Sequence, residues 1–533
     1  MNWKIRFAVL LTTLFATAIT PIIAHANPLE LPGPSKFLYD HPYYKCSANY
    51  YVSLTGSDTN SGTSPSTAWQ TLQHANDSGR KPGDCVNVEP GTYNQGVNIT
   101  SGGNYASSTG YVTYRCLGLD TCIITGQAGG QNGTFAFTTS SQATDIDPPG
   151  SYVILDAFVL KSANPNNIYG QGVELWDNNG NGAGKENTNS VHHVWVLNSI
   201  VSNYGQAGLQ LNDGEFFYAV HNTVYANAYT GCSAQGSGIS FVVNKAFTNY
   251  VPTPDDLKNP VVGNVGSGDY RLVANWNVMF NNATTQCGGV NGGAYDSDGN
   301  NLIFDTLNNS GLGPVYPHAA LAAFNVTFNA GGRGIHIFNS ENVTVANNSC
   351  FNSALDPWNS GSYRPCIGVL NGYNDTMINN IAYGIPSTTG PQNCSYNGQA
   401  VSCNIWNTAY AGGAITGQPA DKWANNISYC TSYNQPWGYG CQPMFGPDVG
   451  GFACTTDPTP GTNQCKTNPL WVNVGTKNVG TETTLPIGSN FALQAASPAI
   501  GKGLTEPYLS SQSVDVGACP HAALHCPMVS SKP

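Results

Sequence analysis

Charged residues are scarce in this chain. Lys, Arg, Asp and Glu make up 9% of its 533 residues, and the 19 basic residues are outnumbered by 30 acidic ones. A chain so poor in cations repels nucleic acid, and we therefore expect no nucleic-acid partner. Disorder is excluded by composition, because 40% of the residues are hydrophobic and they are spread along the whole length.

Several motifs of common protein classes are also missing. The sequence contains no CxxC pair, which argues against a zinc cluster held by paired thiolates. It has no Gly-x-Ser-x-Gly elbow, no P-loop and no Rossmann fingerprint. Leu is sparse, and this argues against leucine-rich repeats.

The N-terminus carries the marks of an export signal. Lys4 and Arg6 precede an almost wholly apolar or small run at 7–23, and a small-x-small site ends at Ala26. We predict a signal peptide over residues 1–26 and a secreted, extracellular or periplasmic location. The apolar run is interrupted by Thr and Pro, and no later segment is apolar enough to cross a bilayer, so no membrane span is expected.

All 16 Cys residues lie beyond the predicted signal peptide, and their number is even. An oxidising compartment would pair most of them. Cys116 with Cys122, and Cys519 with Cys526, are close enough in sequence to be candidate pairs. Spacing alone does not give the other pairs.

An Asn-rich repeat organises the middle of the chain. Its copies are an Asn, four residues and then an Asn or a small residue, and they begin at Asn198, Asn222, Asn277, Asn325 and Asn348, with weaker copies at Asn380 and Asn426. Asn198 and Asn222 are 24 residues apart and Asn325 and Asn348 are 23 apart, and we interpret the gaps of 48, 55 and 46 residues as two such units each. A β-rich repeat of about 20–25 residues is one coil of a parallel β-helix. We expect the Asn side chains to stack as a ladder at one corner.

A second repeated pattern, Gly-apolar-x-apolar, lies between the Asn corners. Its apolar residues alternate with period two and should point inward, which leaves the x position facing outward. In chain order, that position holds Glu174, Gln210, Ser240, His336 and Leu370. A polar column of this kind is suited to an extended sugar chain. A solvated sheet face is the alternative.

The two ends differ from this repeat. We expect an N-terminal cap with the first coils at 27–110, where a short helix at 70–76 would close the open end of the solenoid. The β-helix itself should span 111–393. An irregular, disulfide-rich C-terminal cap with the last coils should follow at 394–533. We expect the protein to be a monomer.

Phrases at both ends resemble the pectate-lyase-like right-handed parallel β-helix superfamily. They are Tyr-Val-Ser-Leu-Thr-Gly-Ser-Asp at 51–58, Gly-Asp-Cys-Val-Asn-Val at 83–88 and Ser-Pro-Ala-Ile at 497–500. The resemblance implies an all-β solenoid that binds an acidic polysaccharide such as pectate or alginate. The superfamily's lyases break the chain by β-elimination beside a uronate carboxylate. That carboxylate must be neutralised, often by Ca²⁺, while a base takes the C5 proton.

The acidic window at 294–305 is the candidate metal site. Asp296, Asp298 and Asp305 lie close together in sequence, beside Asn300, and carboxylate oxygens are the ligands that Ca²⁺ prefers. The window resembles an Asp-Gly-Asn-Gly-Ile phrase of secreted β-helix proteins, with Asn301 in place of the second Gly. The alternative is an Asx-rich turn that bonds its own backbone.

Three cationic or titratable residues are candidate catalytic groups. Arg333 directly precedes the strand that carries His336, and Arg can neutralise a uronate or act as the base, while His can be base or acid. Lys245 follows the strand of Ser240 and is the alternative base. An ion pair to a neighbouring Asp is the structural alternative for Arg333, and a solvent-exposed spacer is that for His336.

The sequence therefore predicts a secreted polysaccharide lyase that acts on a uronate-containing polymer by β-elimination, assisted by Ca²⁺. The expected substrate-binding residues are Glu174, Gln210, Asp213 and Ser240. A glycoside hydrolase, a C5-epimerase and a non-catalytic carbohydrate-binding surface protein remain alternatives, because the superfamily includes all of them.

Overall fold

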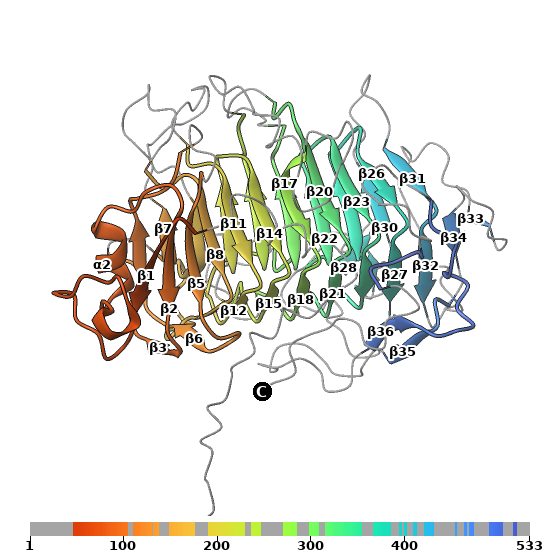
Figure 1. The fold of residues 1–533 in the computed structure, drawn as a ribbon. Helices are drawn as coiled ribbons and strands as arrows, with labels where there is room; N and C mark the ends of the chain where they lie inside the picture. The colour runs from red at the N-terminus through yellow and green to blue at the C-terminus, as the bar shows by residue number, and fades with distance from the viewer. Residues whose placement is uncertain are drawn as a thin grey trace, which may run out of the picture.

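Figure 1 shows the fold of the computed structural model. The structure describes residues 46–104, 110–129, 132–137, 149–175, 190–229, 236–246, 270–284, 298–308, 315–353, 366–384, 394–396, 399–401, 409–412, 421–430, 454–455, 463–465, 468–473, 490–504 and 515–519. The predicted signal peptide at 1–26 and the candidate ligand Asp296 lie outside the described residues.

Three long parallel sheets, here called A, B and C, make up the molecule (Figure 1). Sheet A has 11 strands. In spatial order they are β1 (Ala48–Val52), β2 (Asp84–Val88), β5 (Val112–Cys116), β8 (Val153–Asp156), β11 (Val194–Leu197), β14 (Phe217–Val220), β17 (Tyr270–Asn275), β20 (Ala319–Ala323), β23 (Val343–Ala346), β26 (Thr376–Ile378) and β31 (Lys422–Ala424).

Sheet B has 12 strands. They are β3 (Gly91–Tyr93), β6 (Cys122–Ile124), β9 (Phe158–Lys161), β12 (Ile200–Ser202), β15 (Thr223–Tyr225), β18 (Val278–Phe280), β21 (Val326–Phe328), β24 (Ser349–Phe351), β27 (Ile381–Gly384), β32 (Ile427–Cys430), β34 (Asn463–Cys465) and β33 (Cys454–Thr455).

Sheet C has nine strands. They are β4 (Val97–Ile99), β7 (Gly133–Phe137), β10 (Gln171–Leu175), β13 (Leu209–Asn212), β16 (Ile239–Val242), β19 (Leu302–Asp305), β22 (Ile335–Phe338), β25 (Ile367–Leu370) and β30 (Ala409–Gly412). Along most of the chain, one strand of A, one of B and one of C follow in turn, and each pairs with its counterpart in the next coil. The predicted right-handed parallel β-helix is therefore confirmed.

The core lies between the inner faces of the three sheets. Alternate residues of each strand enter one continuous apolar cluster, as Val173 and Leu175 of β10 and Leu209 and Leu211 of β13 do. The period of two that marks these strands in the sequence is the reason that their intervening residues face outward.

The predicted Asn ladder runs along the corner between sheets A and B. Its members are Asn222, Asn277, Asn325, Asn348, Asn380, Asn426 and Asn463. Each side-chain oxygen accepts the backbone N–H and the amide N–H of the member before it, as Asn325 Oδ1 does from Asn277 at 2.9 and 3.0 Å. These bonds satisfy polar groups at a corner that is otherwise buried.

The prediction that Asn198 starts this ladder is wrong. Ile200 pairs with Thr223, so Ser199 lies opposite Asn222 and its N–H donates to Asn222 Oδ1 at 3.0 Å. Asn198 precedes the ladder position by one residue, and its amide donates to Asp156 Oδ1. It adopts φ 50°, a left-handed conformation that Asn tolerates well.

The N-terminal end is closed by α2 (Leu72–Asp77), which agrees with the short helix predicted at 70–76. Thr71 caps the helix by accepting the N–H of His74, and Leu72 and Ala75 are buried against the first coils. A short 3-10 helix, η2 (Pro65–Thr67), precedes it. The helix thus covers core residues that would otherwise face solvent at the end of the solenoid (Figure 1).

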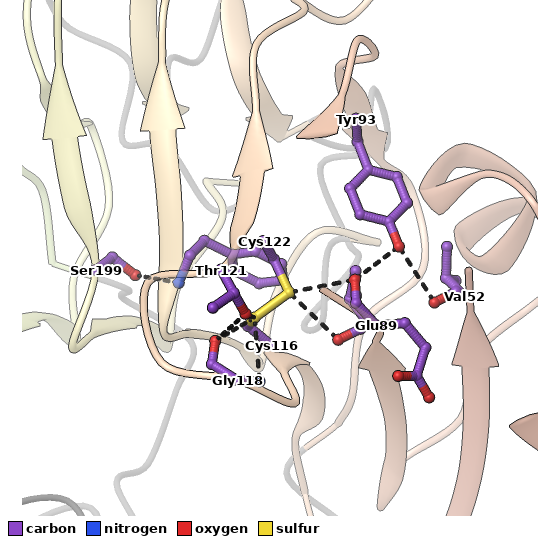
Figure 2. Close-up of a disulfide and its surroundings, with 10 residues drawn as sticks. Val52, Glu89, Tyr93, Cys116, Gly118, Thr121, Cys122 and Ser199 are labelled. Atoms are coloured by element: carbon purple, nitrogen blue, oxygen red, sulfur yellow. Dashed lines mark hydrogen bonds between the residues drawn. A yellow bond between two sulfur atoms is a disulfide. The ribbon is translucent and has the colours of Figure 1, made fainter. Parts of the chain in front are cut away.

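The predicted Cys116–Cys122 disulfide is present and closes the turn between β5 and β6 (Figure 2). Cys122 Sγ lies 3.3 Å from the carbonyl oxygen of Val88 in the preceding coil. Beside it, the hydroxyl of the buried Tyr93 donates to the carbonyl oxygen of Glu89 at 2.8 Å. This bridge therefore fixes a turn that packs directly on the first coil.

The other described bridges are Cys46–Cys85 and Cys350–Cys366. Cys519 is also disulfide-bonded. Cys526, its candidate partner in the sequence, lies outside the described residues. Within the described part of the chain, no helix is both long and apolar enough to span a bilayer.

The C-terminal segment packs along sheet B instead of only ending the solenoid. It includes an antiparallel pair, β35 (Trp471–Asn473) and β36 (Asn490–Leu493), while a second pair is formed by β28 (Cys394–Tyr396) and β29 (Gln399–Val401). Trp471 and Phe491 join the apolar cluster on the outer face of sheet B, where the rings of Phe491 and Phe328 are 5.5 Å apart.

The outer faces of the three sheets differ in chemistry. Sheet A carries a buried apolar column on its outer face, with Ile154, Trp195, Tyr218, Val273 and Leu321. Sheet B is covered by the C-terminal segment over β18, β21, β24, β27 and β32. Sheet C alone has a mostly polar outward column, and it carries the candidate functional residues.

Candidate functional site

Strand register places most of the predicted polar column on the outer face of sheet C. Adjacent positions in successive strands are Glu174, Gln210, Ser240, Ile303, His336 and Gly368. Ile303 is a member that the sequence pattern missed, because Asn301 replaces the Gly of that pattern. The predicted member Leu370 is wrong: it pairs with Phe338, since Cys366 occupies the turn position that Gly334 occupies in the strand before.

Arg333 and His336 form the centre of the candidate site. Arg333 Nη1 lies 3.5 Å from His336 Nδ1, and each residue is only 3% exposed. The interpretation of His336 as a solvent-exposed spacer is therefore wrong. His336 Nε2 is buried and has no hydrogen-bond partner among the described residues. Leaving such an atom unpaired costs about 1–3 kcal/mol, so a bound group or water is expected to meet it.

Burial, with the neighbouring guanidinium of Arg333 as the second cause, holds the pKa of His336 well below its ordinary value of 6.5. The imidazole is therefore neutral at neutral pH. Because a guanidinium only donates, its contact with Nδ1 makes Nδ1 the acceptor and places the imidazole proton on Nε2.

Asn300 joins the acidic window to this pair. Its Oδ1 accepts the backbone N–H of Arg333 at 2.9 Å, and its Nδ2 donates to Ser237 Oγ at 3.2 Å and to Asp298 Oδ1 at 3.4 Å. Asp298, Arg333 and His336 are thus linked through adjacent coils. Asn300 is 33 residues before Arg333, so only the coil register could have revealed its role.

Asp305 lies on the same outer face but at the other end of β19 from Asp298. It is two residues beyond Ile303 and pairs with Phe338. Burial raises the pKa of Asp305, although a hydrogen bond from Thr306 Oγ1 at 2.7 Å acts in the opposite direction.

The described carboxylates do not fit a calcium ligand set. Ca²⁺ takes about 6–8 oxygen ligands, but Asp298 and Asp305 stand at opposite ends of a strand. Among the described residues no three His, Cys, Asp or Glu side chains gather in a way that could hold a metal ion. Asp296, the third predicted ligand, lies outside the described residues. No step of the proposed reaction is assigned to the ion.

Lys245 and Asp213 lie together beyond the C-terminal ends of two sheet C strands. Lys245 Nζ is 4.0 Å from Asp213 Oδ1, and both side chains are largely buried. The structure therefore places Lys245 in an ion pair with Asp213.

At the other end of the column, an acidic side chain, Glu174, lies beside a neutral one, Gln210. Glu174 Oε2 accepts the N–H groups of Asn132 and Gly133 at 3.0 and 2.8 Å. Burial raises the pKa of Glu174, and these two hydrogen bonds act against that rise. In the next strand, Gln210 Nε2 donates to Asn212 Oδ1 at 2.9 Å, while Gln210 Oε1 is buried and has no partner within the described ranges.

A second charged cluster, absent from the sequence predictions, lies before the strands of sheet A. Arg271 Nη1 donates to both carboxylate oxygens of Glu215 at 2.9 Å, and the hydroxyl of Tyr316 donates to Glu215 at 3.4 Å. The guanidinium also packs over Phe216, 4.7 Å from the ring centre. We interpret this buried pair as a structural element of the corner.

No protein-family model matches the chain, and no curated protein sequence is significantly similar to it. Solved structures with a similar strand arrangement include the pectate lyase Pel9A, at 17% identity and a TM-score of 0.46, covering 89% of this chain and 97% of that one. They also include the A-module of the Azotobacter vinelandii mannuronan C-5 epimerase AlgE4, at 12% identity and a TM-score of 0.33, with 70% and 93% covered.

A lacto-N-biosidase from Eubacterium ramulus is a third similar structure, at 13% identity and a TM-score of 0.31, covering 79% of this chain and 68% of that one. By their names these three proteins are a lyase, an epimerase and a glycosidase. Likeness at this level does not choose among their reactions. The fold expected from the pectate-lyase-like resemblance is established by the three parallel sheets themselves.

Proposed function

We propose that this protein is a polysaccharide lyase that cleaves a uronate-containing polymer by β-elimination on the outer face of sheet C. The observation that carries the proposal is the buried pair of Arg333 and His336, in which the imidazole is neutral and its Nε2 has no partner in the part of the chain that the structure describes. A permanent cation beside a neutral base is the combination that proton removal next to a carboxylate requires.

Arg333 would bind the uronate carboxylate and neutralise it. The positive charge of the guanidinium makes the adjacent C5–H bond more acidic. It does so because it stabilises the negative charge that develops on the carboxylate oxygens as the enolate-like anion forms. The same step would draw the guanidinium protons away from His336 Nδ1, so that this nitrogen becomes available as an acceptor.

His336 would then act first as a base and then as an acid. Nδ1 accepts the C5 proton as the C4–O bond breaks and the C4=C5 double bond forms. The imidazolium produced in this way returns a proton from Nε2 to the leaving oxygen. No water is consumed, and the products are one ordinary chain end and one unsaturated uronate end. Because the pair is buried, the substrate must displace the atoms that cover it.

The direct test is the absorbance of unsaturated uronate ends after incubation with a panel of acidic polysaccharides. We expect that absorbance from the wild-type protein and a loss of about 10²–10⁴-fold in kcat for His336→Gln, a typical contribution of acid–base groups. Release of reducing ends without the absorbance would indicate a hydrolase instead. A correctly folded protein that gives neither signal on any polymer would refute the proposal.

A further inference from the structure

The outer face of sheet C is electrically asymmetric. Among the described residues, Arg333 and Lys245 are the Lys or Arg side chains within three residues of a strand of this sheet, and Lys245 lies against Asp213. Glu174 lies at the opposite end of the column from His336. The end of the face that carries Arg333 can therefore attract a carboxylate, whereas the end that carries Glu174 repels one.

Gln210 indicates which chemical group the end of the face near Glu174 can bind. Its side chain is nine-tenths or more buried, and its Nε2 donates to Asn212. Its Oε1 has no partner among the residues that the structure describes. An amide oxygen accepts hydrogen bonds and donates none. A sugar hydroxyl can therefore satisfy Gln210 Oε1, whereas an ionised carboxylate cannot, because it has no proton to donate.

The neighbours of Gln210 in the column support the same reading. Glu174 is its partner in β10 and Ser240 is its partner in β16. A carboxylate placed over Gln210 would lie beside Glu174, and two like charges in a buried setting repel each other strongly. A neutral sugar would avoid this repulsion and offer hydroxyl donors to both side chains.

The two subsites are far enough apart to hold different sugars. Gln210 and His336 are separated by three strand spacings, which is about 14 Å at about 4.8 Å per strand. They therefore cannot contact the same sugar ring.

We infer that the substrate is a heteropolysaccharide, in which a uronate bound at Arg333 and His336 is followed by neutral sugars, one of which donates a hydroxyl hydrogen bond to Gln210. The inference names the substrate class of the proposed lyase site and so rests on that proposal. A homopolymer of uronates would present a carboxylate at every sugar, including those over Gln210 and Glu174.

The test measures binding and cleavage separately on the full protein. The probes are debranched rhamnogalacturonan, in which galacturonate alternates with rhamnose, and gellan, in which glucuronate lies among neutral sugars. Polygalacturonate and alginate serve as homopolymers of uronates. We expect tighter binding and higher kcat/KM on at least one heteropolymer than on either homopolymer, at the same ionic strength.

Three variants locate the effect. Gln210→Met should raise the KM or Kd for the preferred heteropolymer by about tenfold with little change in kcat, as expected for one lost hydrogen bond. Gln210→Lys should shift preference towards polygalacturonate. Gln464→Met is the matched control, because Gln464 Oε1 is also buried and unpartnered but belongs to sheet B. It should leave substrate preference unchanged.

The outcomes separate the two proposals. Equal or tighter binding of a homopolymer, or no binding of either heteropolymer by folded protein, overturns the inference about the substrate. Binding of a heteropolymer that Gln210→Met weakens, with no cleavage of any probe, supports that inference and refutes the lyase. Cleavage of polygalacturonate or alginate in preference to both heteropolymers supports the lyase and refutes the inference.

Discussion

Arg333 and His336 meet on the outer face of sheet C, with Nη1 of the guanidinium 3.5 Å from Nδ1 of the imidazole. They are three residues apart, at the turn before β22 and within it. The contact combines a permanent cation with a base that burial keeps neutral, and it makes the titration of one residue depend on the presence of the other.

The titration of His336 should reveal this dependence. Since its pKa is held below 6.5, the acidic limb of kcat/KM should fall below pH 6.5, and the imidazole NMR signals of the free protein should titrate there too. In Arg333→Gln, one cause of the depression is gone while burial remains, so the His336 titration should move upward. An unchanged titration in the variant would show that Arg333 does not influence His336.

Removal of calcium tests how the uronate charge is neutralised. If Arg333 performs this role, protein treated with a calcium chelator should keep its kcat/KM within about threefold, since the described carboxylates do not gather around an ion. Activity is measured with chelator, then after Ca²⁺ is restored. A loss of more than tenfold that Ca²⁺ reverses would instead support the predicted metal role of Asp296, Asp298 and Asp305.

Asn325 should contribute strongly to stability. In Asn325→Ala, the N–H and amide groups of Asn277 lose their acceptor and remain buried, which should lower the free energy of unfolding by about 3 kcal/mol. Chemical denaturation measures the change. The control is Asn374→Gly in an exposed Asn pair, where the positive φ of 57° is kept and little loss is expected. Equal losses in both variants would contradict the role of the buried ladder.

His221 should make the protein sensitive to acid. Burial lowers its pKa to about 4, from 6.5, so the unfolded chain binds a proton between these values while the folded chain does not. Stability from this residue is therefore complete above pH 6.5 and is lost as the pH falls towards 4, by up to about 3 kcal/mol.

The variant His221→Asn tests that effect. Asn occupies the equivalent turn position in several other coils, including Asn347 and Asn379, and tolerates the positive φ of 60° found at His221. Thermal unfolding of the variant should depend less on pH between 4 and 6.5 than that of the wild type. Parallel curves for the two proteins would exclude His221 as the source of the acid sensitivity.

The fold was predictable because its signals repeat. Period-two alternation identifies the strands, and the repeated Asn identifies the corner of each coil. The interpretation of the longer Asn spacings as two coils is wrong: Asn222 and Asn277, 55 residues apart, and Asn277 and Asn325, 48 residues apart, lie in neighbouring coils, because long loops leave the coil between strands. Substitutions within the repeat caused the other errors: Ser199 takes the ladder position that Asn198 was expected to fill, and Cys366 takes a Gly position, which moved Leu370 off the predicted column.

The site was predictable only where it is local in sequence. The proximity of Arg333 and His336 follows from their spacing of three residues. Contacts across coils depend on loop lengths, which the sequence does not fix, and for this reason the link from Asn300 to Arg333 and the Lys245–Asp213 pair required the structure. Asp298 and Asp305 were expected to act together because they are close in sequence, but β19 separates them, since one lies before the strand and the other is its last residue.

The C-terminal segment has a consequence for how the molecule comes apart. A simple solenoid loses coils from its end one at a time, because each coil touches only its neighbours. Here Ala518 N–H donates to Ser349 Oγ, and Asn379 and Asn425 donate to the carbonyl oxygens of Leu504 and Lys502. The described residues 502–518 thus bind three coils, from the one that contains β24 to the one that contains β32, so these coils cannot separate one at a time without breaking contacts with the C-terminal segment. Unfolding of this half should be cooperative.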